Sequence, residues 1–142
     1  MRLLQHQSDG DLKLTDPLTE NLPQYAILSH TWLSTDEEVS FEDLVKGNAQ
    51  CKAAGFRKIQ FCAEQATKDG LDYFWVDTCC IDKSSSAELQ EAITTMFNWY
   101  RNATKCYVYL VDVSVAEDSV IDPELSCPWE TAFRRSRWFC RG

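Results

Sequence analysis

Three short runs of large apolar residues divide the chain, and each run gives way to polar residues. The central run, Tyr73–Asp77, places four large apolar residues before an aspartate, and the chain then continues as TCCIDK. Uninterrupted runs rich in aromatic and β-branched residues are typical of strands buried on both faces of a sheet. The runs Tyr25–Ser29 and Cys106–Val111 have the same character, so the pattern predicts three buried strands.

Helical periodicity marks the segments that lie before and after the central run. Residues 53–69 repeat apolar residues at helical spacing, and Gly70 is placed to end that helix. Residues 85–101 begin with the capping box Ser85-x-x-Glu88 and carry a broad apolar stripe. The stripe comprises Leu89, Ile93, Met96, Phe97 and Tyr100. We expect this stripe to face the core.

The alternation of strands and helices predicts a single α/β domain, built on a mostly parallel sheet that is flanked by helices. We place this domain at residues 25–142, a length that suits one domain. A weaker capping box, Ser40-x-x-Asp43, predicts an additional short helix inside it. Residues 1–24 are polar with scattered leucines, and we interpret them as an N-terminal segment with at most a short edge strand at Arg2–Leu4.

The charge of the chain is strongly acidic, with a formal net charge of −8 from 22 acidic and 14 basic residues. An acidic protein repels phosphate backbones, so we expect no general nucleic-acid binding. Four arginines nevertheless form a basic cluster near the end of the chain: Arg134, Arg135, Arg137 and Arg141. No run approaches the ~20 apolar residues that a membrane-spanning helix needs, so we expect no membrane span.

The seven cysteines are odd in number and show no C-x-x-C spacing. The start of the chain lacks the pattern of a secretory signal peptide, because polar residues follow the first four positions at once. Disulfides are rare in reducing compartments. We therefore expect reduced thiols, no bound metal and a cytoplasmic protein.

Polar side chains gather where the predicted strands end. Ser29, His30 and Trp32 follow the first buried strand, and Asp77 follows the central one. Because ligands bind at the carboxyl ends of strands in an open α/β sheet, we expect a pocket between these two strand ends. The other candidates for its wall come after the central strand: Cys80, Asp82 and Glu88. Turn formation is the simpler explanation of Ser29 and Asp77, since both residue types hydrogen-bond nearby backbone.

Several of these residues have a structural alternative. Cys79 or Cys80 could act as a nucleophile with His30 as its base, but free cysteine is also a common core residue. Adjacent cysteines suit neither tetrahedral zinc spacing nor an unstrained disulfide. Glu88 could supply a catalytic carboxylate or complete its helix cap. The chain has no G-x-G-x-x-G and no G-x-x-x-x-G-K-[ST], so Rossmann-type dinucleotide binding and P-loop chemistry lack motif support.

Three blocks of the chain form a specific combination: YAILSHTW, then YFWVDTCCIDKSSSAELQEAITTMFNWYRNA with the following CYVYL, then FRRSRWFCRG. In this order they resemble the heterokaryon incompatibility (HET) domain of filamentous fungi, and they cover most of the chain from Tyr25 onward. The resemblance implies a role in allorecognition and programmed cell death. It also implies self-association or other incompatibility proteins as partners.

The HET domain in turn resembles the Toll-interleukin receptor (TIR) domain remotely, which implies a flavodoxin-like fold. In this comparison Tyr25–Ser29 and Phe74–Asp77 resemble the first two TIR strands, and Ser136–Phe139 resembles the Ser-x-Trp-Cys that opens a later TIR helix. Some TIR domains cleave NAD with a glutamate that lies shortly after that motif. HET domains usually continue there with Trp-Thr-Leu-Gln-Glu, whereas this sequence ends at Gly142.

The resemblance therefore implies a HET domain that is truncated at its C-terminus, with its catalytic residue unassigned. We expect an incomplete sheet edge or helix layer, exposed apolar surface, and no NAD hydrolysis by this chain alone. The first functional hypothesis is a signalling domain that triggers cell death, with NAD as a substrate of the full-length protein and no bound cofactor. The alternative is a non-enzymatic module that signals by homotypic assembly.

Overall fold

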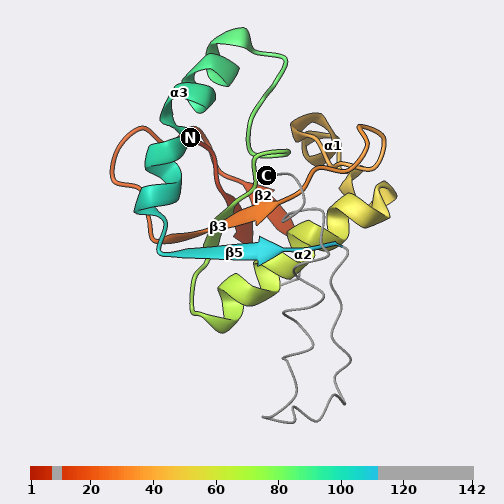
Figure 1. The fold of residues 1–142 in the computed structure, drawn as a ribbon, viewed down its shortest axis with the longest axis horizontal. Coiled ribbons are helices and arrows are strands. Elements are labelled where there is room, and N and C mark those ends of the chain that lie inside the picture. The colour runs from red at the N-terminus through yellow and green to blue at the C-terminus, as the bar shows by residue number, and fades with distance from the viewer. Residues whose placement is uncertain (8–10, 112–142) are drawn as a thin grey trace, which may run out of the picture.

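The computed structural model describes residues 1–7 and 11–111 (Figure 1). In these residues the elements follow one another as β1 (Leu4–His6), β2 (Leu12–Leu14), β3 (Tyr25–His30), α1 (Phe41–Val45), the 3₁₀ helix η1 (Ala49–Cys51), α2 (Ala53–Lys68), β4 (Tyr73–Trp75), α3 (Ser86–Asn102) and β5 (Lys105–Tyr109). The three predicted strands and three predicted helices are all present. No helix in this part of the chain is long and apolar enough to cross a membrane.

The five strands form one sheet in the order β2-β1-β4-β3-β5. β3 pairs in parallel with both β4 and β5, whereas β1 pairs antiparallel with β2 and with β4. The sheet is therefore mixed, and the prediction of a mostly parallel sheet is wrong. The reason lies in the connections: helices carry the chain across between the parallel strands, but only a short loop joins β1 to β2, which must turn back.

The N-terminal segment contributes directly to this sheet. The predicted edge strand at Arg2–Leu4 is instead β1, which starts at Leu4 and lies between β2 and β4. Leu3 and Leu4 are fully buried, and the Leu3 amide donates a hydrogen bond to the Thr15 hydroxyl at 3.0 Å. Residues 1–24 thus supply two strands and part of the core.

Side-chain alternation along β3 assigns one face of the sheet to α2 and the other to α3 (Figure 1). On the α2 face, the Tyr107 hydroxyl donates to the Gln65 carbonyl at 3.1 Å. On the α3 face, the Tyr25 hydroxyl donates to the Trp99 carbonyl at 2.7 Å, and the rings of Trp75 and Trp99 meet edge to face at 5.5 Å. The core therefore lies in two layers around β3 and β4.

The two long helices confirm their predictions to different degrees. α2 buries Ile59, Ala63 and Ala66 as expected, and Gly70 follows it with a φ of 73°, the left-handed conformation that ends helices. α3 begins after its predicted cap, and Leu89, Met96 and Tyr100 of its stripe pack against the core. The prediction is wrong for the other two residues of the stripe. Ile93 and Phe97 are 62% and 74% exposed, and the buried residues of α3 are Ala92 and Trp99.

Ile93 and Phe97 are exposed because other residues of α3 face the sheet. Trp99 packs on Trp75, and small Ala92 lies seven residues earlier on the same side of the helix. Ile93 lies one position further round, about 100° away, and therefore points off the covered part of the sheet.

Several predictions lie outside the described residues: the FRRSRWFCRG block, the arginine cluster, and Cys127 and Cys140.

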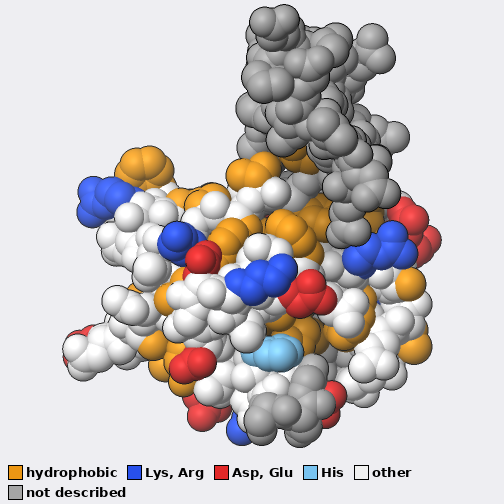
Figure 2. Space-filling model, turned by 90° about the horizontal axis from the view of Figure 1, so that it is seen from below, with side chains coloured by type: hydrophobic (Ala, Val, Ile, Leu, Met, Phe, Trp, Pro, Cys, Tyr) orange, Lys and Arg blue, Asp and Glu red, His pale blue; other side chains and the backbone are white. Residues whose placement is uncertain are grey.

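Charged side chains of both signs are interspersed on the face seen from below in Figure 1. Figure 2 shows blue and red groups side by side there, and the described side chains of that face form no continuous basic surface. Exposed ion pairs of the described residues include Lys46–Glu42 and Lys105–Asp69. Apolar side chains also reach this face between the charged ones (Figure 2).

Candidate functional site

The carboxyl ends of β3 and β4 bring His30 and Asp77 into direct contact. The two strands are adjacent and parallel, so the residues that follow them emerge at the same edge of the sheet. His30 Nε2 lies 2.8 Å from Asp77 Oδ1, and the Trp32 indole N–H donates to Asp77 Oδ2 at 2.8 Å. The side chains of His30 and Asp77 are only 2% and 15% exposed. The carboxylate is therefore held from two sides in a nearly dry position.

A buried lysine extends this contact into a network. Lys58 of α2 is fully buried, and its ammonium makes an ion pair with Glu38. The same Nζ lies 3.1 Å from His30 Nδ1 and donates to the Thr31 carbonyl at 3.0 Å. We call these residues the Asp77 network: Trp32, Asp77, His30, Lys58 and Glu38.

The network assigns the tautomer of His30. A lysine ammonium has three donors and no acceptor, and all three of its donors here have partners. His30 Nδ1 lies 3.1 Å from this ammonium and 3.2 Å from the Thr31 carbonyl. With Lys58 as the donor, Nδ1 accepts, and the His30 proton lies on Nε2 and is donated to Asp77. Both ring nitrogens are therefore engaged, and His30 is not available as the base for a cysteine nucleophile.

The pKa of the Asp77 carboxyl is held below its ordinary value. Burial alone raises this pKa, but the hydrogen bonds from His30 and Trp32 and the nearby Lys83 ammonium together outweigh burial. Asp77 is thus an ionised carboxylate in a position with little solvent. Such a group can stabilise a positive charge that develops next to it.

Lys58 and Glu38 are functional candidates that the sequence-based prediction missed. The signal in the sequence is the position of Lys58, which lies four residues before Cys62 on the buried side of α2. A lysine among residues that face a core requires a buried partner. No spacing rule identifies that partner as Glu38, because it comes from the loop before α1.

Gly55 allows the Glu38 loop to lie against α2. Its amide donates to the Glu37 carbonyl at 3.1 Å, and a Cβ at position 55 would lie 2.4 Å from that oxygen and 2.8 Å from the Val39 nitrogen. Only glycine fits such a close backbone approach. The Leu33 amide donates to Glu38 Oε1 at 2.7 Å and fixes the carboxylate over Lys58.

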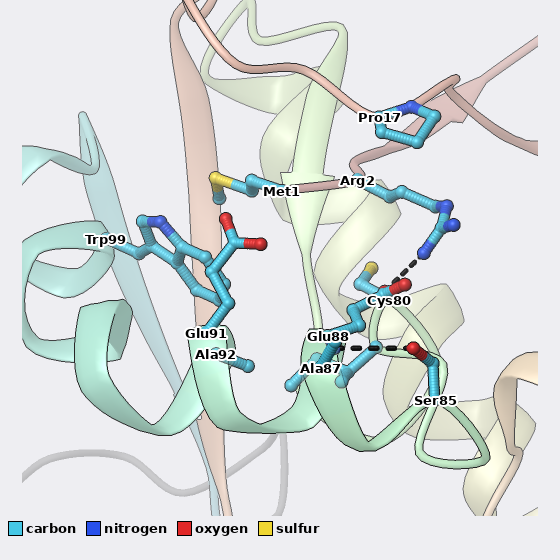
Figure 3. A pocket seen from close by; sticks show the side chains of 11 residues that line it. Met1, Arg2, Pro17, Cys80, Ser85, Ala87, Glu88, Glu91, Ala92 and Trp99 are labelled. Atoms are coloured by element: carbon cyan, nitrogen blue, oxygen red, sulfur yellow. Dashed lines mark hydrogen bonds and ion pairs between the residues drawn. The ribbon is translucent and has the colours of Figure 1, made fainter.

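Two other candidates, Cys80 and Glu88, line a separate cavity of about 270 Å³ between α3 and the N-terminal segment. Figure 3 shows Arg2 reaching from that segment to the Glu88 carboxylate at the start of α3. The Ser85 hydroxyl accepts from the Glu88 amide at 3.4 Å, as a cap should. The Glu88 carboxylate, however, accepts from the Asp82 amide at 3.0 Å instead of completing the predicted capping box.

The remaining candidates lie elsewhere. Asp82 lines a groove of about 520 Å³ between α1 and residues 78–84, and its carboxylate accepts from the Ser84 amide and hydroxyl. Ser29 precedes His30 on β3 and therefore points to the opposite face of the sheet. Among residues 1–7 and 11–111, no group of three histidine, cysteine or acidic side chains could hold a metal ion, and the five cysteines there are free.

By its fold and site, the chain is a mixed α/β domain that carries an ionised aspartate, Asp77, at the carboxyl edge of its sheet. The comparisons with known proteins show the family to which it belongs. The family model "Heterokaryon incompatibility protein (HET)" matches residues 25–141, so the chain belongs to the HET family and the resemblance is confirmed. Vegetative incompatibility protein HET-E-1 of Podospora anserina is 54% identical over 144 residues, a match that covers the whole chain and 10% of the relative. No solved structure matches the chain.

Proposed function

We propose that this chain is the signalling domain of a fungal incompatibility protein, and that its signal leads to cell death. The proposal rests on membership of the HET family and on the name of the relative, a vegetative incompatibility protein. The chain spans about a tenth of that relative, so the proposal concerns one domain of a longer protein. Recognition of the partner strain would belong to other parts of such a protein.

The chemical part of the proposal is hydrolysis of NAD in the full-length protein, with Asp77 beside the reacting ribose. The bond between C1′ and the nicotinamide nitrogen breaks, nicotinamide leaves as a neutral base, and water adds to C1′ and releases a proton. Positive charge develops on the ribose in the transition state, and a desolvated carboxylate stabilises such charge. The contact of His30 and Trp32 with Asp77 is the observation that carries this step.

The topology supports the remote kinship with TIR domains. Counted along the chain, the parallel strands β3, β4 and β5 lie in the spatial order second, first, third. Flavodoxin-like sheets begin with this same order. Both arrangements place polar residues at the carboxyl edge, where Asp77 lies here.

The test is release of nicotinamide by the full-length protein and by its Asp77→Asn variant. We expect the variant to lose at least about 100-fold in rate, the usual scale for removal of one electrostatic stabiliser. Asp72→Asn is the matched control, because Asp72 is an exposed aspartate at the opposite end of β4. Equal rates for wild type and Asp77→Asn would refute the role of Asp77, and no release by wild type would refute hydrolysis.

Exposed apolar surface favours homotypic assembly as a second candidate function. Ile93 and Phe97 on α3 and Val108 on β5 are exposed large hydrophobic residues. Among the described residues β5 is also an outer strand of the sheet, and an open strand edge can pair with a second copy. Sedimentation velocity tests this function: assembly of wild type that Phe97→Ser abolishes, without any nicotinamide release, would establish assembly in place of hydrolysis.

A further inference from the structure

Trp32 is an exposed aromatic residue whose orientation is nevertheless fixed. Trp32 is 64% exposed, yet its indole N–H donates a hydrogen bond to Asp77 Oδ2 at 2.8 Å. The anchored edge lies next to a carboxylate, and much of the ring remains exposed. A rigid, electron-rich aromatic face beside a negative charge is the arrangement by which proteins bind organic cations.

A cation already occupies one face of this ring. The Lys83 ammonium lies 5.0 Å from the centroid of the Trp32 ring, within the range of a cation–π contact. No carboxylate of the described residues lies within salt-bridge distance of Lys83, in contrast to Lys46, Lys52, Lys58 and Lys105. Lys83 is exposed, so the Trp32 ring and the field of Asp77 are what attract its ammonium to this position.

We propose that the Trp32 face, with Asp77 beside it, is a binding site for a flat organic cation, and that Lys83 occupies this site until the ligand displaces it. A planar, delocalised cation fits better than a metal ion, because both Asp77 oxygens already accept hydrogen bonds and the rest of the surface is an apolar ring. The chemical class is a pyridinium or a similar aromatic cation. Its identification with the nicotinamide ring of NAD rests on the proposed function, whereas the cation site does not.

The groove beside Trp32 offers room for the remainder of such a ligand. Lys83 and Thr78, the neighbour of Asp77, both line the groove of about 520 Å³. This volume falls within the range of small-molecule sites. A ligand whose cationic ring displaces Lys83 would therefore extend along α1, past Phe41 and Val45.

Competition by Lys83 has a measurable consequence. An internal occupant reduces the apparent affinity of a ligand by the factor equal to the fraction of molecules in which the site is free. Removal of the ammonium should then strengthen cation binding by about two- to fivefold, the factor that corresponds to an exposed cation–π contact. A lysine that served instead to bind an anionic part of the ligand would produce the opposite change.

The experiment is titration of the protein with N-methylnicotinamide, a pyridinium cation without ribose or phosphate, measured by isothermal titration calorimetry. We expect Lys83→Met to bind this probe about two- to fivefold more tightly than wild type. Lys13→Met should leave binding unchanged, because Lys13 is an exposed lysine of β2 that does not line the groove. Neutral nicotinamide should bind more weakly and show no dependence on Lys83.

Three results would overturn the proposal: weaker or unchanged binding by Lys83→Met, equal binding of nicotinamide and its cation, or binding that survives Trp32→Leu. Lys83 is exposed, so its variant does not threaten the fold. The outcome is also separate from that of the proposed function. Lys83-dependent binding of N-methylnicotinamide without any NAD cleavage would support the cation site and refute the hydrolase, and cleavage without such binding would do the reverse.

Discussion

The two faces of the sheet are closed in different ways. On one face α2 packs across β1, β4, β3 and β5, and the ion pair of Lys58 with Glu38 is buried there. On the other face α3 buries only Ala92 and Trp99 and leaves Phe97 in solvent. Buried charge is therefore found where the helix covers the sheet fully, and exposed apolar surface where it does not. This difference separates a candidate chemical site from a candidate assembly surface.

The largest effect is expected when the buried charge of Lys58 on the α2 face is removed. Lys58→Met leaves Glu38 buried and unpaired, and we expect it to lower the free energy of unfolding by about 3–5 kcal/mol. Denaturant unfolding measures this loss. Lys46→Met is the control, because its ion pair with Glu42 is exposed and should contribute little to stability.

A double variant sharpens the result. Lys58→Met combined with Glu38→Gln removes both charges and should recover part of the lost stability, because the penalty comes from the unpaired partner. A Lys58→Met protein as stable as wild type would show that the ammonium is not buried in solution.

The second prediction concerns the close approach of α2 to the Glu38 loop. Gly55→Ala places a methyl group against the Glu37 carbonyl and should destabilise the protein by about 1–3 kcal/mol, the usual penalty of overpacking. Thermal or urea unfolding measures this change. In an open helix position the same substitution stabilises by about 0.5–1 kcal/mol, so a stabilised variant would contradict the described approach.

The third prediction moves to the α3 side. Glu88→Gln keeps an oxygen acceptor for the Asp82 amide and loses the charge that pairs with Arg2. We expect a loss of about 1 kcal/mol or less, because the pair is partly exposed. Urea unfolding measures the cost. A full-length protein that stays folded but loses killing activity would instead show that Glu88 takes part in function.

The smallest expected effect is a pH dependence at the start of α1. Burial raises the pKa of Asp43, but hydrogen bonds from Lys52 and Ser40 outweigh it and lower that pKa to about 2. Because the folded-state pKa is depressed, the stabilisation is present above the unfolded-state value of about 3.9 and disappears as the pH falls toward 2. Urea unfolding at several pH values should show a shallower acid loss for Asp43→Asn than for wild type. Identical slopes would contradict the contacts with Lys52 and Ser40.

Much of the parallel part of the sheet could be predicted from sequence, because long apolar runs report burial directly. The contact between His30 and Asp77 also follows from two adjacent strand ends. The hairpin of β1 and β2 could not be predicted, since three-residue strands carry almost no periodic signal. Glu88 was assigned to the wrong partner because spacing alone does not reveal the competing amide of Asp82.

The missed residues of the Asp77 network share one cause. Charged side chains are expected at the surface, and only the tertiary approach of the loop before α1 makes Glu38 available to Lys58. The exposure of Phe97 was also missed because it depends on tertiary packing. Large apolar residues are expected inside, but Ala92 and Trp99 decide which side of α3 meets the sheet.

The central claim is that Lys58 sets the tautomer of His30, which in turn holds Asp77 in place. Long-range proton–nitrogen NMR correlation of the imidazole rings tests it directly, because the chain has only two histidines and His6→Asn leaves His30 alone. We predict one tautomer of the His30 imidazole, with Nε2 protonated and Nδ1 bare. A protonated Nδ1, or a mixture of tautomers unchanged by Lys58→Met, would contradict the account.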